Sequence, residues 1–92
     1  MIQDKVKFFK ALGNETRLRI IRYLLEEDHC ACDFESKVGR DQTTISRHLK
    51  VLTEAGILEK ERDGRNIVYK IEDEDLKKTF KEFGIDEIEP CC

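Results

Sequence analysis

The segment RDQTTISRHLKVLTEAGIL, residues 40–58, constrains the fold more than any other part of the chain. Its apolar residues recur at a spacing of three and four, which predicts an amphipathic helix with one buried stripe. The positions of that stripe are Ile45, Leu49 and Leu52. Asp41 is typical of a helix N-cap, and Gly56 stands where helices commonly end. We therefore expect one helix between Asp41 and Gly56.

A β-hairpin is predicted directly after this helix. Apolar and polar residues alternate on both sides of Asp63-Gly64, a dipeptide that favours a tight two-residue turn. The predicted strands are residues 57–62 and 66–71.

The rest of the chain has helical spacing, with helices expected near residues 2–12, 14–27, 33–39 and 73–84. Asn14, Asp33 and Asp73 are the predicted N-caps. The order is helix, helix, helix, helix, strand, strand, helix, and the helix pair before the hairpin meets at a glycine-containing turn. We predict a mainly α winged helix-turn-helix domain over residues 1–84, followed by a cysteine-containing tail over residues 85–92.

Composition favours a helical protein that shares its core with a partner, because 40% of the 92 residues are charged and 39% are apolar. The apolar stripes of the first and last predicted helices are candidates for such a shared core. These stripes are Ile2, Val6 and Phe9, and Leu76, Phe80 and Phe83. No apolar run reaches the roughly 18 residues that span a membrane, and the N-terminus lacks a secretory pattern. We expect a cytoplasmic protein with reduced cysteines.

The net charge of −3 is unevenly distributed along the chain. Residues 36–71 hold eight basic and five acidic residues, whereas residues 26–35 hold five acidic residues and no basic one. DNA binding depends on the local field at the contacting face, so an acidic chain can still have a basic reading surface.

The polar side of the helix after Asp41 is a candidate DNA-reading face. It lacks acids until Glu54, and it carries residue types that contact base edges and phosphates. Arginines at the hairpin tip can reach an adjacent groove or phosphates. The candidate DNA-binding residues are Gln42, Thr43, Thr44, Ser46, Arg47, His48, Lys50, Arg62 and Arg65.

Three stretches carry a family resemblance: FKALGNETRLRIIRYLLE, CACDF and QTTISRHLKVLTEAGILEKERDGRNIVYKI. Over about residues 5–83 the chain resembles the ArsR/SmtB family of metal-sensing winged-helix repressors. The resemblance implies a homodimer, formed through the first and last helices, that binds operator DNA and releases it when a metal ion binds. It implies a regulator and not an enzyme, and the chain shows no catalytic motif.

The CACD stretch matches the thiol motif of the arsenic-sensing members, which implies Cys30 and Cys32 as ligands. Thiolates select soft ions, so the expected inducer is As(III), with Cd(II) or Zn(II) as alternatives. Arsenic-sensing relatives often have a third cysteine one turn later, and this chain has none there. Cys91 and Cys92 are the remaining candidate ligands.

Geometry makes this motif a candidate switch. Residues two apart in a regular helix point about 200° apart, so chelation by both cysteines requires the start of the third helix to be unwound or to unwind. Open alternatives are two separate thiol pairs, zinc held by the cysteines with His29, and a redox or persulfide sensor that oxidises the thiols. A DNA-packaging protein without metal response is a further alternative.

Overall fold

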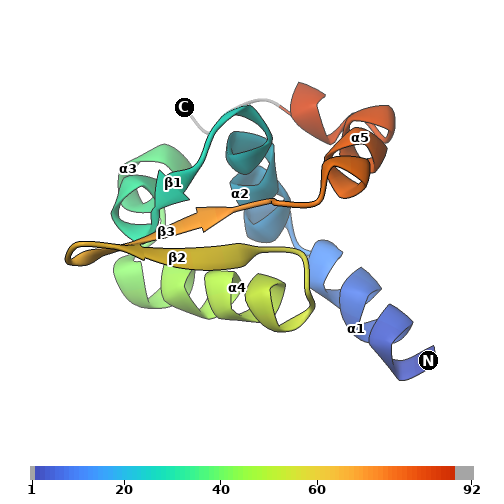
Figure 1. Ribbon diagram of the computed structural model, residues 1–92, viewed down its shortest axis with the longest axis horizontal. Helices are drawn as coiled ribbons and strands as arrows, with labels where there is room; N and C mark the ends of the chain where they lie inside the picture. The colour runs from blue at the N-terminus through green and yellow to red at the C-terminus, as the bar shows by residue number, and fades with distance from the viewer. Residues whose placement is uncertain (1, 89–92) are drawn as a thin grey trace.

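The structure is a computed structural model that describes residues 2–88. Within that part of the chain, five α-helices surround a small sheet, with two short 3₁₀ turns (Figure 1). The elements are α1 (Ile2–Leu12), α2 (Glu15–Glu26), β1 (His29–Cys30), the 3₁₀ turn η1 (Ala31–Asp33), α3 (Phe34–Val38), α4 (Gln42–Glu54), β2 (Glu59–Asp63), β3 (Asn66–Lys70), α5 (Glu74–Glu82) and the 3₁₀ turn η2 (Ile85–Glu87). This order confirms the predicted winged helix-turn-helix.

The sheet is antiparallel with β3 in its centre, in the order β1-β3-β2. The predicted hairpin is confirmed, and Gly64 in its turn has a φ of 64°. The sequence analysis missed β1, in which His29 is opposite Tyr69 and Cys30 is opposite Val68. A two-residue strand is too short to show alternation, and its pairing depends on backbone groups of β3. β1 therefore joins the cysteine segment to the wing.

One hydrophobic core lies between α2, α3, α4 and the sheet. Its buried members come from all five helices, but α1 contributes only Ala11, near its end. The largest of them are Phe34, Phe80, Ile20, Ile21, Leu24, Ile45, Leu49, Leu52, Leu58 and Ile71. The predicted stripe of α4 is confirmed. In α2, Ile20 is buried and Leu18 is half-buried.

The predicted helix caps are confirmed in part. The side chains of Asn14 and Asp73 accept backbone hydrogen bonds at the starts of α2 and α5. Asp33 and Asp41 make no such cap bond, so both predictions were wrong in this respect. Asp33 lies 3.2 Å from the His29 ring, and Asp41 accepts a bond from the Thr44 hydroxyl at 2.6 Å. The partner of Asp33 lies four residues before it, and the partner of Asp41 lies three residues after it.

The two helices expected to meet a partner differ in burial. Ile2 and Phe9 on α1 are 77% and 66% exposed, and Phe83 after α5 is 79% exposed. Phe80, expected on the same stripe, is instead buried in the core of its own chain. An all-apolar pocket of about 310 Å³ lies between α1, α2 and α5. α1 also projects from the body of the molecule (Figure 1).

Part of the predicted tail is structured. η2 contacts α2, and the Ile88 carbonyl accepts a hydrogen bond from Arg22 Nε at 2.6 Å. Residues 85–88 therefore pack against the domain. None of the described helices is both long and apolar enough to cross a membrane.

Leu49→Ala is expected to lower the free energy of unfolding by about 2–5 kcal/mol, because it leaves a cavity at a fully buried position of α4. Val51→Ala, at an exposed position of the same helix, is expected to change it by about 0.5 kcal/mol or less. Urea unfolding followed by circular dichroism measures both. Equal losses in the two variants would contradict this assignment of the core.

Candidate DNA-reading surface and thiol site

The outer face of α4 carries most of the predicted reading residues. Five of them are exposed and line a shallow depression: Gln42, Thr43, Ser46, Arg47 and Lys50. Lys50 lies 3.9 Å from Glu54, an exposed pair that contributes little to stability. Within residues 2–88 Arg47 forms no ion pair, so its guanidinium is available to a ligand.

Two predicted reading residues, Thr44 and His48, make side-chain contacts within the protein. The Thr44 hydroxyl donates to the Asp41 carboxylate, and this bond lowers the pKa of Asp41. His48 is half-buried, and its Nδ1 lies 3.3 Å from Arg17 Nη1. Helical periodicity assigned both to the outer face, but each lies at its border, where neighbouring side chains decide the orientation.

His48 has a pKa lowered from its ordinary value. Partial burial is the main cause, and the positive charges of Arg17 and Arg40 add to it. Each of these effects disfavours the imidazolium form. The ring is therefore neutral at pH 7 and can accept a hydrogen bond.

The wing presents the two predicted arginines at its turn. Arg62 is the last but one residue of β2, and Arg65 lies in the turn; both are exposed. Neither forms an ion pair within the described part of the chain. Behind them, Lys70 Nζ donates to Glu61 at 2.8 Å across the two strands. This contact raises the pKa of Lys70 and lowers that of Glu61.

The two cysteines of the CACD stretch lie before α3, outside any regular helix. Cys30 ends β1 and Cys32 is in η1. The predicted requirement for an unwound segment is thus met without a further conformational change. Each sulfur lies within 4.8 Å of the other and of an Asp33 carboxylate oxygen. Two sulfurs and one carboxylate form a donor set that fits a soft or borderline divalent ion.

The structure joins Cys30 and Cys32 in a disulfide, whereas the sequence analysis expected reduced thiols. The irregular backbone holds their Cα atoms 5.3 Å apart, which is within the range that a disulfide bridges. Reduction would return both sulfurs as ligands. Cys91 and Cys92, the other predicted ligands, lie outside the described residues.

His29, considered above as a zinc ligand, is buried beside the thiol site at 6% exposure. Its Nδ1 lies 3.2 Å from Asp33 Oδ2, and its ring makes edge contacts with Tyr23 and Phe34. His29 is therefore packed in the domain and linked to the site through Asp33. The sequence analysis did not assign Asp33 as a ligand, and no sequence signal pointed to the pair, because His29 lies in β1 and Asp33 in η1 and no single helix brings them together.

A family model described as "Bacterial regulatory protein, arsR family" matches residues 14–60, just over half of the chain. The chain belongs to the ArsR family of bacterial regulatory proteins. The match covers α2, the thiol segment, α3, α4 and the start of the wing.

Relatives of this ArsR-family chain include metal-resistance regulators. It is 36% identical over 79 residues to a homologue of the cadmium resistance transcriptional regulatory protein CadC from Staphylococcus aureus, covering 85% of this chain and 65% of the relative. It is 37% identical over 80 residues to the HTH-type transcriptional regulator MJ1325 of Methanocaldococcus jannaschii, covering 86% and 90%. A homologue of the transcriptional repressor SmtB from Synechocystis is 28% identical over 80 residues, with 87% and 61% covered. The chain thus spans less than two thirds of the length of the CadC and SmtB homologues.

Solved structures agree with this fold. The crystal structure of Mycobacterium tuberculosis Rv0081 superposes with a TM-score of 0.81 at 32% identity, covering 87% of this chain and 81% of that one. The homodimeric winged helix-turn-helix DNA-binding domain of Mb0332 from Mycobacterium bovis superposes with a TM-score of 0.84 at 27% identity, covering 91% and 78%. These relatives are transcription regulators, which agrees with the expectation that the ArsR-family chain is not an enzyme.

The lowered pKa of His48 predicts a pH-dependent contribution to stability. A proton binds the unfolded histidine more readily than the folded one, so the wild-type chain loses stability as pH falls below about 6.5. His48→Gln removes this loss. The difference in free energy of unfolding, wild type minus variant, is expected to shrink from pH 8 to pH 5.5 in urea titrations. A difference that grows on acidification would contradict the stated cause.

Proposed function

We propose that this chain is a dimeric transcriptional repressor that binds operator DNA through α4 and the wing and releases it when a soft metal ion binds at Cys30 and Cys32. One observation carries the proposal. The thiol segment is itself part of the DNA-reading framework, because β1 pairs with the wing strand β3 and η1 packs against α4.

DNA binding is supported by the surface that α4 and the wing share. α4 presents amide, hydroxyl, guanidinium and ammonium groups on one exposed face, and these groups suit base edges and phosphates in a major groove. Arg62 and Arg65 on the wing suit the adjacent backbone or groove. Thr44 is the weakest of the predicted contacts, because its hydroxyl is bound to Asp41.

Dimerisation through α1 and α5 is supported by the apolar side chains that the single chain leaves exposed. Phe9 and Phe83 lie at the rim of the apolar pocket between these helices, and Ile2 and Val6 extend the apolar face along α1. Burying such surface against a second copy is favourable in proportion to its area. A two-fold dimer, as in the Mb0332 domain, would present two α4 helices to successive half-sites.

The described donor set favours Cd(II) or Zn(II) as inducer. Cys30 and Cys32 supply two sulfurs, and Asp33 supplies a carboxylate oxygen. On binding the ion, this oxygen would lose its contact with His29. The cadmium-resistance regulator among the relatives supports the same class of ion. As(III) prefers three sulfurs, and therefore requires a third thiolate from Cys91 or Cys92.

Release follows from the two contacts of the thiol segment. An ion held by the two sulfurs and Asp33 would impose its own coordination geometry on these side chains, take Asp33 from His29 and so alter β1 and η1. β1 would transmit this change to β3 and the wing, and η1 would transmit it to α4. Both DNA-contacting elements would then leave their binding geometry together.

A second candidate function, thiol redox sensing, is supported by the disulfide between Cys30 and Cys32. A peroxide would oxidise the two thiols to the disulfide, and the protein would lose two electrons and two protons. Hydrogen peroxide would thereby be reduced to two molecules of water, and an organic peroxide to one alcohol and one water. The same β1 and η1 contacts would transmit this change.

Metal-dependent release is tested with a duplex selected by the reduced, metal-free chain from a random library. At fixed salt and with reductant, Cd(II) is expected to weaken binding about 10-fold or more, and Cys30→Ser is expected to abolish the effect. The double variant Cys91→Ser/Cys92→Ser should retain the response to Cd(II) and lose the response to As(III). Unchanged affinity with every ion would contradict metal sensing.

The redox alternative is separated by oxidation without metal. If the chain senses metal, the oxidised and the reduced metal-free forms bind the selected duplex with equal affinity while Cd(II) releases it. If oxidation releases the duplex and metals under reductant do not, the redox function is correct. Mass spectrometry gives the disulfide content of each sample.

Arg47→Ala is expected to weaken binding of the selected duplex by about 10-fold, because Arg47 is the unpaired guanidinium on the exposed face of α4. Lys78→Ala removes one positive charge from α5, which lies apart from α4 (Figure 1), and is the matched control. Equal effects of the two variants would mean that only net charge matters and that α4 is not the reading helix.

A further inference from the structure

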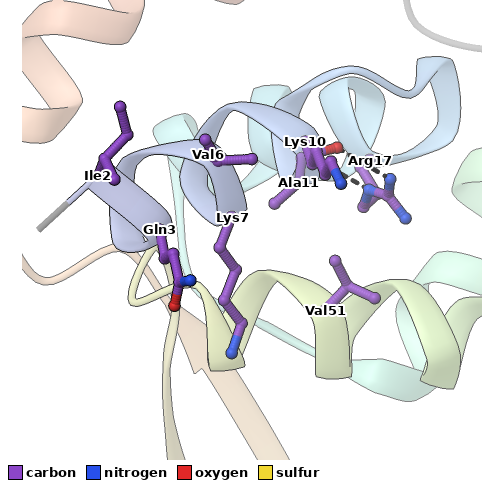
Figure 2. A pocket seen from close by; sticks show the side chains of 8 residues that line it. All are labelled: Ile2, Gln3, Val6, Lys7, Lys10, Ala11, Arg17 and Val51. Carbon is purple, nitrogen blue, oxygen red and sulfur yellow. Dashed lines mark hydrogen bonds between the residues drawn. The ribbon is translucent and has the colours of Figure 1, made fainter.

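Arg17, at the start of α2, connects three helices through its side chain. Its Nε donates to the Ala11 carbonyl at 2.7 Å and its Nη2 donates to the Lys10 carbonyl at 3.2 Å, as Figure 2 shows. Both carbonyls lie in the last turn of α1, where helix carbonyls lack intrahelical donors. Its third nitrogen, Nη1, lies 3.3 Å from His48 Nδ1 on α4.

The chemistry of the contact sets the state of His48. A guanidinium can only donate hydrogen bonds, so Nδ1 must accept, and the ring proton must be on Nε2. The pKa of His48, lowered first by burial, agrees with a neutral ring. The Arg17 backbone is held by its N–H, which donates to the Asn14 cap at 3.1 Å, and its guanidinium is held by the two α1 carbonyls.

The contact lies where α1 and α4 are otherwise poorly packed. An open groove of about 440 Å³ runs between α1 and α4, lined by Val6, Ala11 and Val51 and rimmed by lysines (Figure 2). Apolar packing of one stripe tolerates small rotations of a helix about its axis. His48 lies between Arg47 of the reading face and the buried Leu49, at the border of that stripe. Because a hydrogen bond is directional, a bond at this position restricts the rotation of α4.

We propose that Arg17 and His48 form a positioning pair for DNA reading, which fixes the rotation of α4 relative to α1 and α2. His48 then acts through α4 and does not touch DNA, and Arg17 contributes to operator affinity from outside the DNA surface. This inference rests on the proposed function, in which α4 is the reading helix.

The test uses the selected duplex and fluorescence anisotropy at several salt concentrations. Arg17→Met, which keeps the length of the side chain but has no donor, and His48→Ala are each expected to weaken binding about 10-fold. The slope of log affinity against log salt should stay unchanged, because no phosphate contact is lost. The double variant should bind no more weakly than the weaker single variant, since both remove the same contact.

His48→Asn is the matched control. Its side-chain oxygen lies close to the position of Nδ1 and can accept from Arg17, so this variant should recover most of the affinity lost in His48→Ala. Arg17→Met also removes the bonds to two α1 carbonyls, of which that of Lys10 keeps its bond from the Gly13 N–H, so its unfolding curve is measured alongside. If Arg17→Met does not fold, the comparison of alanine with asparagine at position 48 decides the question.

Several results would overturn the inference. A fall of about one in the salt slope of His48→Ala would mean that His48 contacts a phosphate as an imidazolium, which contradicts both the neutral ring and the positioning role. Unchanged affinity in His48→Ala, or no recovery in His48→Asn, would remove the positioning role. Nitrogen-15 NMR of the free chain at pH 7.5 should show an unprotonated Nδ1 on His48, and a proton there would contradict the pair without reference to DNA. A wild-type chain that selects no duplex would instead contradict the proposed function itself.

Discussion

The backbone pairing of His29 and Cys30 with Tyr69 and Val68 is the interaction on which the proposed switch depends. Without it, the CACD segment would be a loop beside a hairpin, and a ligand on its sulfurs would have no route to the wing. With it, the cysteine segment is an edge strand of the same sheet that presents Arg62 and Arg65. Two paired positions are enough to set the register of β1 on β3.

The proposed reading helix α4 is held from two sides by different kinds of interaction. On one side η1 and α3 pack against it, and the buried Phe34 of α3 contacts the ring of His29. On the other side Arg17 holds His48 by a hydrogen bond. The first contact connects α4 to the thiols and the second connects it to α1, whose apolar face is exposed. Inducer binding and dimerisation would therefore act on α4 through separate contacts.

Sequence patterns predicted the elements that are long enough to repeat. The buried stripe of α4 has three members at helical spacing, and apolar and polar residues alternate on both sides of Asp63-Gly64. Both elements were therefore predicted, together with the turns that follow or join them. β1 was missed because two residues carry no period. The contacts of Thr44 and His48 within the protein were missed for another reason. Both residues lie at the border of a helix face, where neighbouring side chains decide the orientation: Asp41, three residues earlier, binds Thr44, and the distant Arg17 lies against His48. The assignment of Cys30 and Cys32 as a pair came from the family resemblance of the CACD stretch, whereas the contribution of Asp33 required the irregular backbone of η1.

Hydrogen exchange of the reduced chain, with and without Cd(II), tests the central claim most directly, because it follows the wing without DNA. The account predicts that Cd(II) changes the exchange of backbone amides in both residues 29–33 and residues 66–70, since β1 and β3 are paired. Both changes should disappear in Cys30→Ser. A change confined to residues 29–33, with β3 unaffected, would contradict the claim that the thiol site acts on the wing.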